Sequence, residues 1–176
     1  EEMQVLDKDD LEDVLDLKFK NNNFIVTFHP ETLDPKSSIR HLKELLNSLD
    51  NFKNSLIIFT LPNADAGNAD LRDLIQDFSL TRDNCYSFSS LGHNKYISLL
   101  KIVDCVIGNS SSGIIEAPFL KTPTVNIGNR QAGREFSKSV INCDPDSSSI
   151  TSSINKALSS SFVQKINSAD TPYYSK

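Results

Sequence analysis

A short stretch of the chain, residues 106–116, combines three consecutive serines with a glycine and a glutamate. It starts as an apolar run, breaks at a glycine, passes through the serines and resumes as an apolar segment. This pattern predicts a strand, a tight turn and then a helix. The first turn of such a helix points unpaired N–H groups and the positive end of the helix dipole at one spot. That spot suits an anion, most often a phosphate.

Individual residues of the stretch have distinct chemical uses. Ser110, Ser111 and Ser112 add hydroxyl donors for an anion. Gly113 lets a ligand approach the backbone closely. Glu116 is expected about one turn into the helix, where a carboxylate is poorly placed for a phosphate but well placed to accept two ribose hydroxyls. The alternative is a serine-capped helix after a buried strand, with Glu116 as a favourable charge in the first turn.

Apolar, β-rich runs and amphipathic segments alternate along the rest of the chain. Strands are expected at residues 24–28, 55–60, 84–88, 104–107, 123–127 and, at an edge, 139–142. Helices are expected at residues 37–50, 68–78, 93–102, 111–120 and 146–158. Continuous apolar strands between helices predict a parallel sheet with both faces covered, which is an α/β, doubly wound, Rossmann-like fold.

A doubly wound sheet binds ligands at the carboxyl ends of its strands. Four polar loops follow predicted strands, so they are expected to meet at one edge of the sheet: residues 29–31, 63–67, 110–116 and 128–134. His29, at a strand end, is either structural or placed to donate to a phosphate or to act as an acid or base. Asn63 either contacts the ligand or makes an Asx-turn after Pro62.

Two arginines in the last of these loops offer permanent positive charge for a diphosphate. Arg130 lies two residues beyond Gly128, at the end of its strand, and a guanidinium binds a diphosphate with a bidentate fork. Arg134 has Glu135 beside it, and a surface pairing between these two is the favoured interpretation for Arg134. We therefore expect Arg130 to be the phosphate contact.

Composition excludes several classes of protein. The chain has 176 residues, 38% of them hydrophobic, and a net charge of −5 without a Lys/Arg cluster, which argues against nucleic acid as a partner. No apolar run approaches the roughly 20 residues of a membrane helix, and the acidic, polar start shows no signal peptide. Neither a GxGxxG motif nor a P-loop lysine is present, so no dinucleotide cofactor is indicated.

The three cysteines are odd in number and widely spaced, at Cys85, Cys105 and Cys143. Two of them fall in or beside strand-like apolar runs. This distribution predicts reduced, buried thiols in a cytoplasmic protein, with neither a metal site nor a disulfide framework.

Four segments, taken in order, resemble the carboxyl-terminal domain of the hydrolysing UDP-N-acetylglucosamine 2-epimerases of the sialic-acid pathway type: residues 27–30, 62–67, 107–113 and 128–135. The Pro172-Tyr173 pair resembles the start of the family's closing segment. The resemblance implies one half of a GT-B-like enzyme with two Rossmann-like domains and the substrate between them. It implies an incoming interdomain linker at residues 1–23, a UDP-binding domain at 24–160 and a truncated tail at 161–176.

The implied reaction converts UDP-N-acetylglucosamine and water into UDP and N-acetylmannosamine, through anti-elimination of UDP and addition of water to a 2-acetamidoglucal. The family's main acid and base carboxylates belong to the amino-terminal domain, so this chain alone is expected to be inactive. The resemblance implies a catalytic role for His29 and nucleotide binding by Asn63, Leu91, Ser110, Ser111, Gly113, Glu116 and Arg130.

The resemblance also implies the partners of the protein. These are UDP-N-acetylglucosamine or UDP, the missing amino-terminal domain and, at full length, further copies of the same chain; no metal or cofactor is implied. Epimerases acting on diacetylbacillosamine share the pattern, so the exact sugar stays open. Two other functions stay open as well: a GT-B glycosyltransferase domain and a nucleotide-binding module without catalysis.

Overall fold

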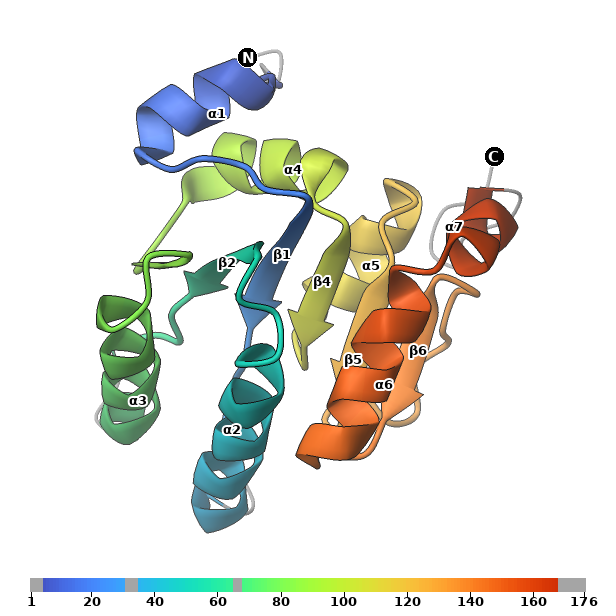
Figure 1. Cartoon of the computed structure of the whole chain (residues 1–176). Coiled ribbons are helices and arrows are strands. Elements are labelled where there is room, and N and C mark those ends of the chain that lie inside the picture. The colour runs from blue at the N-terminus through green and yellow to red at the C-terminus, as the bar shows by residue number, and fades with distance from the viewer. Residues whose placement is uncertain (1–4, 31–34, 65–67, 168–176) are drawn as a thin grey trace.

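The computed structural model describes residues 5–30, 35–64 and 68–167. The described residues form a six-stranded, all-parallel sheet with the strand order β3-β2-β1-β4-β5-β6 (Figure 1). The strands are β1 Asn22–Thr27, β2 Ser55–Thr60, β3 Cys85–Phe88, β4 Cys105–Gly108, β5 Thr124–Ile127 and β6 Val140–Cys143. The order confirms the predicted doubly wound, Rossmann-like fold, and it changes direction between β1 and β4.

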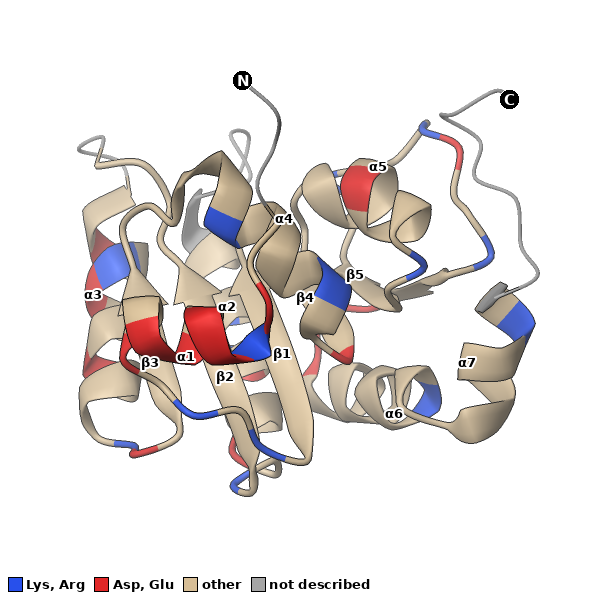
Figure 2. Ribbon diagram, turned by 90° about the horizontal axis from the view of Figure 1, so that it is seen from above, with Lys and Arg blue, Asp and Glu red and all other residues tan. Residues whose placement is uncertain are grey.

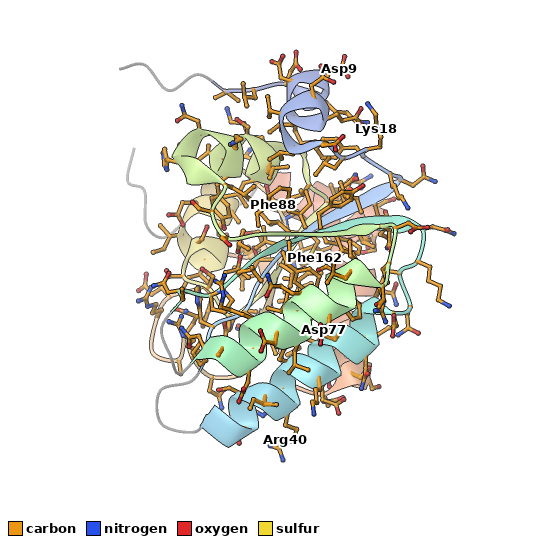
Figure 3. All side chains as sticks on the ribbon, turned by 90° about the vertical axis from the view of Figure 1, so that its left-hand side faces the viewer. Asp9, Lys18, Arg40, Asp77, Phe88 and Phe162 are labelled. Atoms are coloured by element: carbon orange, nitrogen blue, oxygen red, sulfur yellow. The ribbon has the colours of Figure 1, made fainter. Side chains whose placement is uncertain are left out.

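Helices cover both faces of this sheet. One face packs against α2 Pro35–Leu49, α3 Ala69–Leu80 and α6 Ser147–Ala157, with α7 Ser160–Asn167 beside α6. The other face packs against α1 Lys8–Leu15, α4 Gly92–Ile102 and α5 Ser112–Phe119. Figure 3 shows the sheet almost edge-on between the two layers. Within the described ranges, no helix is both long enough and apolar enough to span a membrane.

The larger of the two cores follows the helical periodicity of the sequence. The inward positions of α2 lie three or four residues apart, and all are buried: Leu42, Leu45, Leu46 and Leu49. The inward positions of α6 follow the same rule and contact the same cluster: Ile150, Ile154 and Ala157. Full burial of one such side chain stabilises the fold by about 1.5–3 kcal/mol. The buried residues of α2 and α6 therefore hold these helices against one face of the sheet.

The first helix, α1, packs against the smaller core. Leu11 and Leu15 are buried there, whereas Val14 is 54% exposed. The Asp7 carboxylate caps the helix by accepting a 2.9 Å hydrogen bond from the Asp10 N–H. Asp9, Asp10 and Asp13 of this helix are exposed, and Figure 2 draws much of its ribbon in the colour of acidic residues. A role of residues 1–23 as an interdomain linker stays a prediction.

The sequence pattern did not indicate the last helix. Residues 161–176 were expected to form a tail, but α7 spans most of the first half of that segment. Phe162 and Ile166, four residues apart, are buried in the larger core. The Pro172-Tyr173 pair lies outside the described residues, as do Glu31 and residues 65–67 of the predicted loops.

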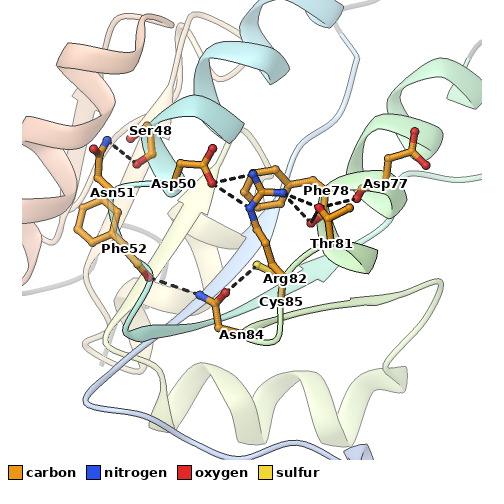
Figure 4. A network of polar contacts seen from close by, with 10 residues as sticks. All are labelled: Ser48, Asp50, Asn51, Phe52, Asp77, Phe78, Thr81, Arg82, Asn84 and Cys85. Atoms are coloured by element: carbon orange, nitrogen blue, oxygen red, sulfur yellow. Dashed lines mark hydrogen bonds and ion pairs between the residues drawn. The ribbon is translucent and has the colours of Figure 1, made fainter.

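Arg82 joins the ends of α2 and α3 at the amino edge of the sheet (Figure 4). Its Nε and Nη2 donate to Asp50 Oδ1 at 2.9 and 2.7 Å, and its Nη1 donates to the Phe78 carbonyl at 3.0 Å. The guanidinium also lies 3.5 Å from the centroid of the Phe78 ring. Arg82 therefore links the end of α2 to the end of α3.

Two of the three cysteines are buried as expected, whereas Cys143 is only half-buried. Cys85 and Cys105 are free thiols within the larger core. Burial raises the pKa of the Cys85 thiol to about 11 and raises that of Cys105 further. Both therefore stay protonated and act as small apolar side chains.

Candidate functional site

The centre of the sheet brings two strand ends very close together. Gly108, the last residue of β4, has a φ of 135°, and a Cβ built there would lie 1.9 Å from the Thr27 carbonyl oxygen of β1. Only glycine fits such an approach. Directly after it, the Asn109 N–H donates to the same carbonyl at 3.1 Å. This junction lies at the change in strand order, where open α/β sheets bind ligands.

Asn109 connects the end of β4 to the loop after β1. Its side chain is fully buried, with 0% exposure. Asn109 Oδ1 accepts from the His29 N–H at 2.7 Å, and Asn109 Nδ2 donates to the His29 carbonyl at 2.8 Å. This asparagine lies within the serine stretch, but no pattern in the sequence indicates a role for it.

The backbone carbonyl of Asn109 connects the same point to the loop after β5. It accepts from Arg130 Nη1 at 3.2 Å and from Gln131 Nε2 at 2.7 Å. The structure therefore brings His29 and Arg130 together, as the loop positions predicted, and it does so through one residue.

His29 is half-buried beside a positive charge. Burial lowers the pKa of its imidazole first, and the Arg130 guanidinium lowers it further. Both causes disfavour the charged ring. A neutral imidazole offers one N–H donor and one acceptor, which suits hydrogen bonding to a phosphate oxygen or a proton transfer.

The serine turn differs in detail from the expected helix start. Ser111 is the N-cap of α5 and its side chain makes no capping hydrogen bond, whereas Ser110 Oγ accepts a 3.4 Å hydrogen bond from the Ser112 N–H. The N–H groups of Gly113 and Ile114 already donate to the Ser110 and Ser111 carbonyls, at 3.2 and 3.0 Å. These two N–H groups are therefore already paired within the turn, and the serine hydroxyls add donors for an anion.

The structure explains the glycine at position 113 differently from the expectation. It is buried, and a Cβ built there would lie 2.8 Å from Thr124 Cγ2 of β5. The missing side chain lets α5 pack closely on the sheet, and this position does not face an open approach for a ligand. The proposed contact between Gly113 and the nucleotide stays a prediction.

One oxygen of the Glu116 carboxylate lies in an unusual environment. Glu116 Oε2 is buried and, among the described residues, has no hydrogen-bond partner. Leaving a buried acceptor unsatisfied costs about 1–3 kcal/mol, so this oxygen calls for a partner, such as a water, an ion or a ligand hydroxyl. On the same turn, Ser112 Oγ accepts a 2.7 Å hydrogen bond from the Tyr96 hydroxyl of α4.

A shallow cleft opens beside Ser112 and Tyr96. It is lined by Thr27, Thr60, Ser90, Leu91, Gly92, His93, Tyr96, Ser110 and Ser112. The hydroxyls of Thr27 and Thr60 contact each other across the ends of β1 and β2. Two predicted site residues, Leu91 and Ser110, therefore share the cleft, whereas His29, Glu116 and Arg130 lie outside its lining.

Asn63 stands apart from the other predicted residues. It is exposed just beyond β2, and its backbone carbonyl accepts a 3.0 Å hydrogen bond from Asn68 Nδ2. The described residues give it no contact with the cleft.

The fold and this cleft define the class of the protein: an α/β, Rossmann-like domain that presents its polar loops at the switch point of the sheet. The family follows from comparison with known proteins. The chain belongs to the UDP-N-acetylglucosamine 2-epimerase family, whose model matches residues 2–176.

Two curated relatives illustrate the match. The GDP/UDP-N,N'-diacetylbacillosamine 2-epimerase (hydrolyzing) of Campylobacter jejuni is 41% identical over 143 residues, which are 81% of this chain and 37% of that protein. The polysialic acid biosynthesis protein P7 of Escherichia coli is 37% identical over 152 residues, which are 86% of this chain and 39% of that protein. The chain thus spans well under half the length of these relatives, and it matches their carboxyl-terminal region.

A solved structure shows the same fold. The UDP-GlcNAc 2-epimerase of Neisseria meningitidis, crystallised with UDP-GlcNAc, superposes with a TM-score of 0.69 at 15% identity. The superposition covers 94% of this chain and 44% of that one.

Proposed function

We propose that this domain binds the UDP part of a nucleotide sugar and that the whole protein is a hydrolysing 2-epimerase. One observation supports this most directly: a buried carboxylate oxygen of Glu116 has no hydrogen-bond partner among the residues that the structure describes, one helical turn from the serine hydroxyls. A ribose diol would donate to that carboxylate while the diphosphate meets the serines. Family membership agrees with this division of the nucleotide.

The reaction proposed for the whole protein has two steps. First, a base removes the C2 proton of UDP-N-acetylglucosamine while the bond between C1 and the UDP oxygen breaks, which gives UDP and 2-acetamidoglucal. Water then adds its oxygen to C1, and a proton is delivered to the opposite face of C2, which gives N-acetylmannosamine. The carboxylates that move these protons are proposed to lie outside this chain, in the amino-terminal domain.

This domain would act on the leaving group. A departing diphosphate develops negative charge, which Arg130 and the hydroxyls of Ser110 and Ser111 would stabilise. His29 adds a neutral imidazole next to Arg130, placed to donate to a phosphate oxygen of the departing UDP.

The identity of the sugar is a separate part of the proposal. We favour UDP-N-acetylglucosamine and the supply of N-acetylmannosamine for sialic-acid or related synthesis. The Campylobacter relative, whose name gives diacetylbacillosamine, supplies the second candidate. Incubating the whole protein with each nucleotide sugar, without an acceptor, tests both points. The nucleotide sugar from which free 2-epimerised sugar is released identifies the substrate, and no release from either one contradicts an epimerase.

Ligand binding to residues 1–176 tests the role of this domain. We expect UDP to bind weakly and the chain alone to release no sugar. Glu116→Ala should weaken UDP binding by about 1–3 kcal/mol, because a charge-assisted hydrogen bond is lost. Pyrophosphate, which has no ribose, should bind unchanged. Asp77→Ala, on the exposed side of α3, is the matched control. An equal loss for both ligands would place Glu116 at the phosphates or in the fold, and turnover by this chain alone would refute the division of labour.

A further inference from the structure

Every polar group of Asn109 has a partner. Its N–H donates to the Thr27 carbonyl, its side-chain amide exchanges two hydrogen bonds with the His29 backbone, and its carbonyl accepts from Arg130 and Gln131. These five bonds connect the end of β4 to the loops after β1 and β5. Both polar atoms of the Asn109 side chain are therefore already bonded within the protein, and the side chain is fully buried.

The side-chain amide of Asn109 extends the sheet by one step. The β1–β4 ladder pairs Thr27 with Gly108 as its last register position. Beyond it, the Asn109 amide offers an acceptor and a donor to the His29 N–H and carbonyl, as a neighbouring strand would. The backbone of His29 is thereby fixed where the strand itself has ended.

We propose that Asn109 is a positioning residue: it holds the His29 backbone and the Arg130 side chain at a fixed separation, which determines where both meet a bound diphosphate. The diphosphate part rests on the proposed function above. The coupling between His29 and Arg130 does not, because it exists without a ligand.

The coupling has a direct readout in the titration of His29. Arg130→Ala removes a positive charge beside the imidazole, so it should raise the pKa of His29. NMR spectra recorded across the titration measure this pKa. Asn109→Ala removes the two hydrogen bonds to the His29 backbone and keeps the carbonyl that accepts from Arg130, so the imidazole is no longer held near the guanidinium. In that background, Arg130→Ala should raise the pKa of His29 by about half as much or less, because the interaction of two charges falls with their distance. A merely structural role of Asn109 would lower stability and leave this difference unchanged.

Asn84→Ala is the matched control background. Asn84 is also a buried asparagine, and its Nδ2 donates to the Ser55 carbonyl at 2.7 Å, but it lies at the amino edge of the sheet. In that background, Arg130→Ala should shift the pKa of His29 as fully as in the unsubstituted chain. An equal shift in the Asn109→Ala background, with the protein folded, overturns the proposal.

A second measurement needs no substitution at Asn109, whose loss affects several buried groups. In the unsubstituted chain, the side-chain NH2 signals of Asn109 should move at the midpoint of the His29 titration, whereas those of Asn84 should stay. Signals of Asn109 that ignore this titration also overturn the proposal. If the coupling is present and added UDP moves neither Asn109 nor His29, the proposed function fails and the positioning role stands.

Discussion

The Tyr96 hydroxyl donates a 2.7 Å hydrogen bond to the hydroxyl of Ser112, which joins the middle of α4 to the first residue of α5. Burial is the main cause that raises the pKa of Tyr96, and the charge of Glu116 adds to it, so the phenol remains a donor. With its oxygen already accepting from Tyr96, Ser112 can aim its own proton at an anion in the cleft.

Tyr96→Phe should therefore weaken UDP binding. The variant keeps the ring and loses one neutral hydrogen bond, which contributes about 0.5–1.5 kcal/mol. Calorimetric titration with UDP measures the change. Tyr86→Phe, in β3 against the same core, is the control and should bind like the unsubstituted chain. Equal affinities for both variants would show that Ser112 is oriented without Tyr96.

Arg130→Ala should cost more UDP affinity than Arg134→Ala. Both arginines are exposed, but Arg130 donates to the Asn109 carbonyl and lies beside His29, whereas Arg134 lies farther along the loop. We expect a difference on the order of 1 kcal/mol or more, which shrinks as salt rises because screening weakens the wet part of the contact. Titrations at two salt concentrations measure both effects. A larger loss for Arg134→Ala would mean that the loop reaches the cleft by its far end.

Protonation of His29 should destabilise the fold. Its pKa is lower in the folded chain than the value of about 6.5 expected in the unfolded chain. The unfolded state therefore binds the proton more readily. The stability that neutral His29 contributes to the fold is complete above the unfolded pKa and is lost as the pH falls through the folded pKa. His29→Asn should flatten the fall in unfolding temperature below about pH 6.5, relative to His93→Asn, which substitutes an exposed histidine at the start of α4. Parallel curves for the two variants would contradict this account.

Gly108→Ala should prevent β4 from pairing with β1. The new methyl group would overlap the Thr27 carbonyl oxygen, which is rigid backbone in the neighbouring strand. Gly133→Ala is the control, since its φ of 85° is also positive but no atom lies within 4 Å of the added Cβ. We expect a loss of about 1 kcal/mol in the control from backbone strain, and an unfolded or insoluble chain for Gly108→Ala. Circular dichroism and thermal unfolding distinguish the two.

Most of the architecture was predictable because it depends on local patterns. The apolar run at residues 55–60 became β2 with the same bounds, and the leucine period after Ser37 became α2. The missed helix α7 gives the opposite case. It starts with two serines, and only Phe162 and Ile166 enter the core, so the segment is too short to show a clear period.

The site was predictable only as a meeting of loops. The positions of His29 and Arg130 after parallel strands implied that they approach each other, and the structure joins them through Asn109. The role of Asn109 itself depends on the register between β1 and β4, which no local pattern states. For the same reason, the contact between Gly113 and Thr124 required the packed structure.

The separation of His29 and Asn109 by 80 residues has a consequence for biosynthesis. A chain emerging from the ribosome completes β1, β2 and β3 well before β4 becomes available to lie beside β1. The cost of closing so long a segment must be met before the central pair forms, and contacts of this range slow folding. A nucleotide bound as proposed would recognise only chains that have finished this step, and by mass action it would shift newly made chains toward the completed sheet.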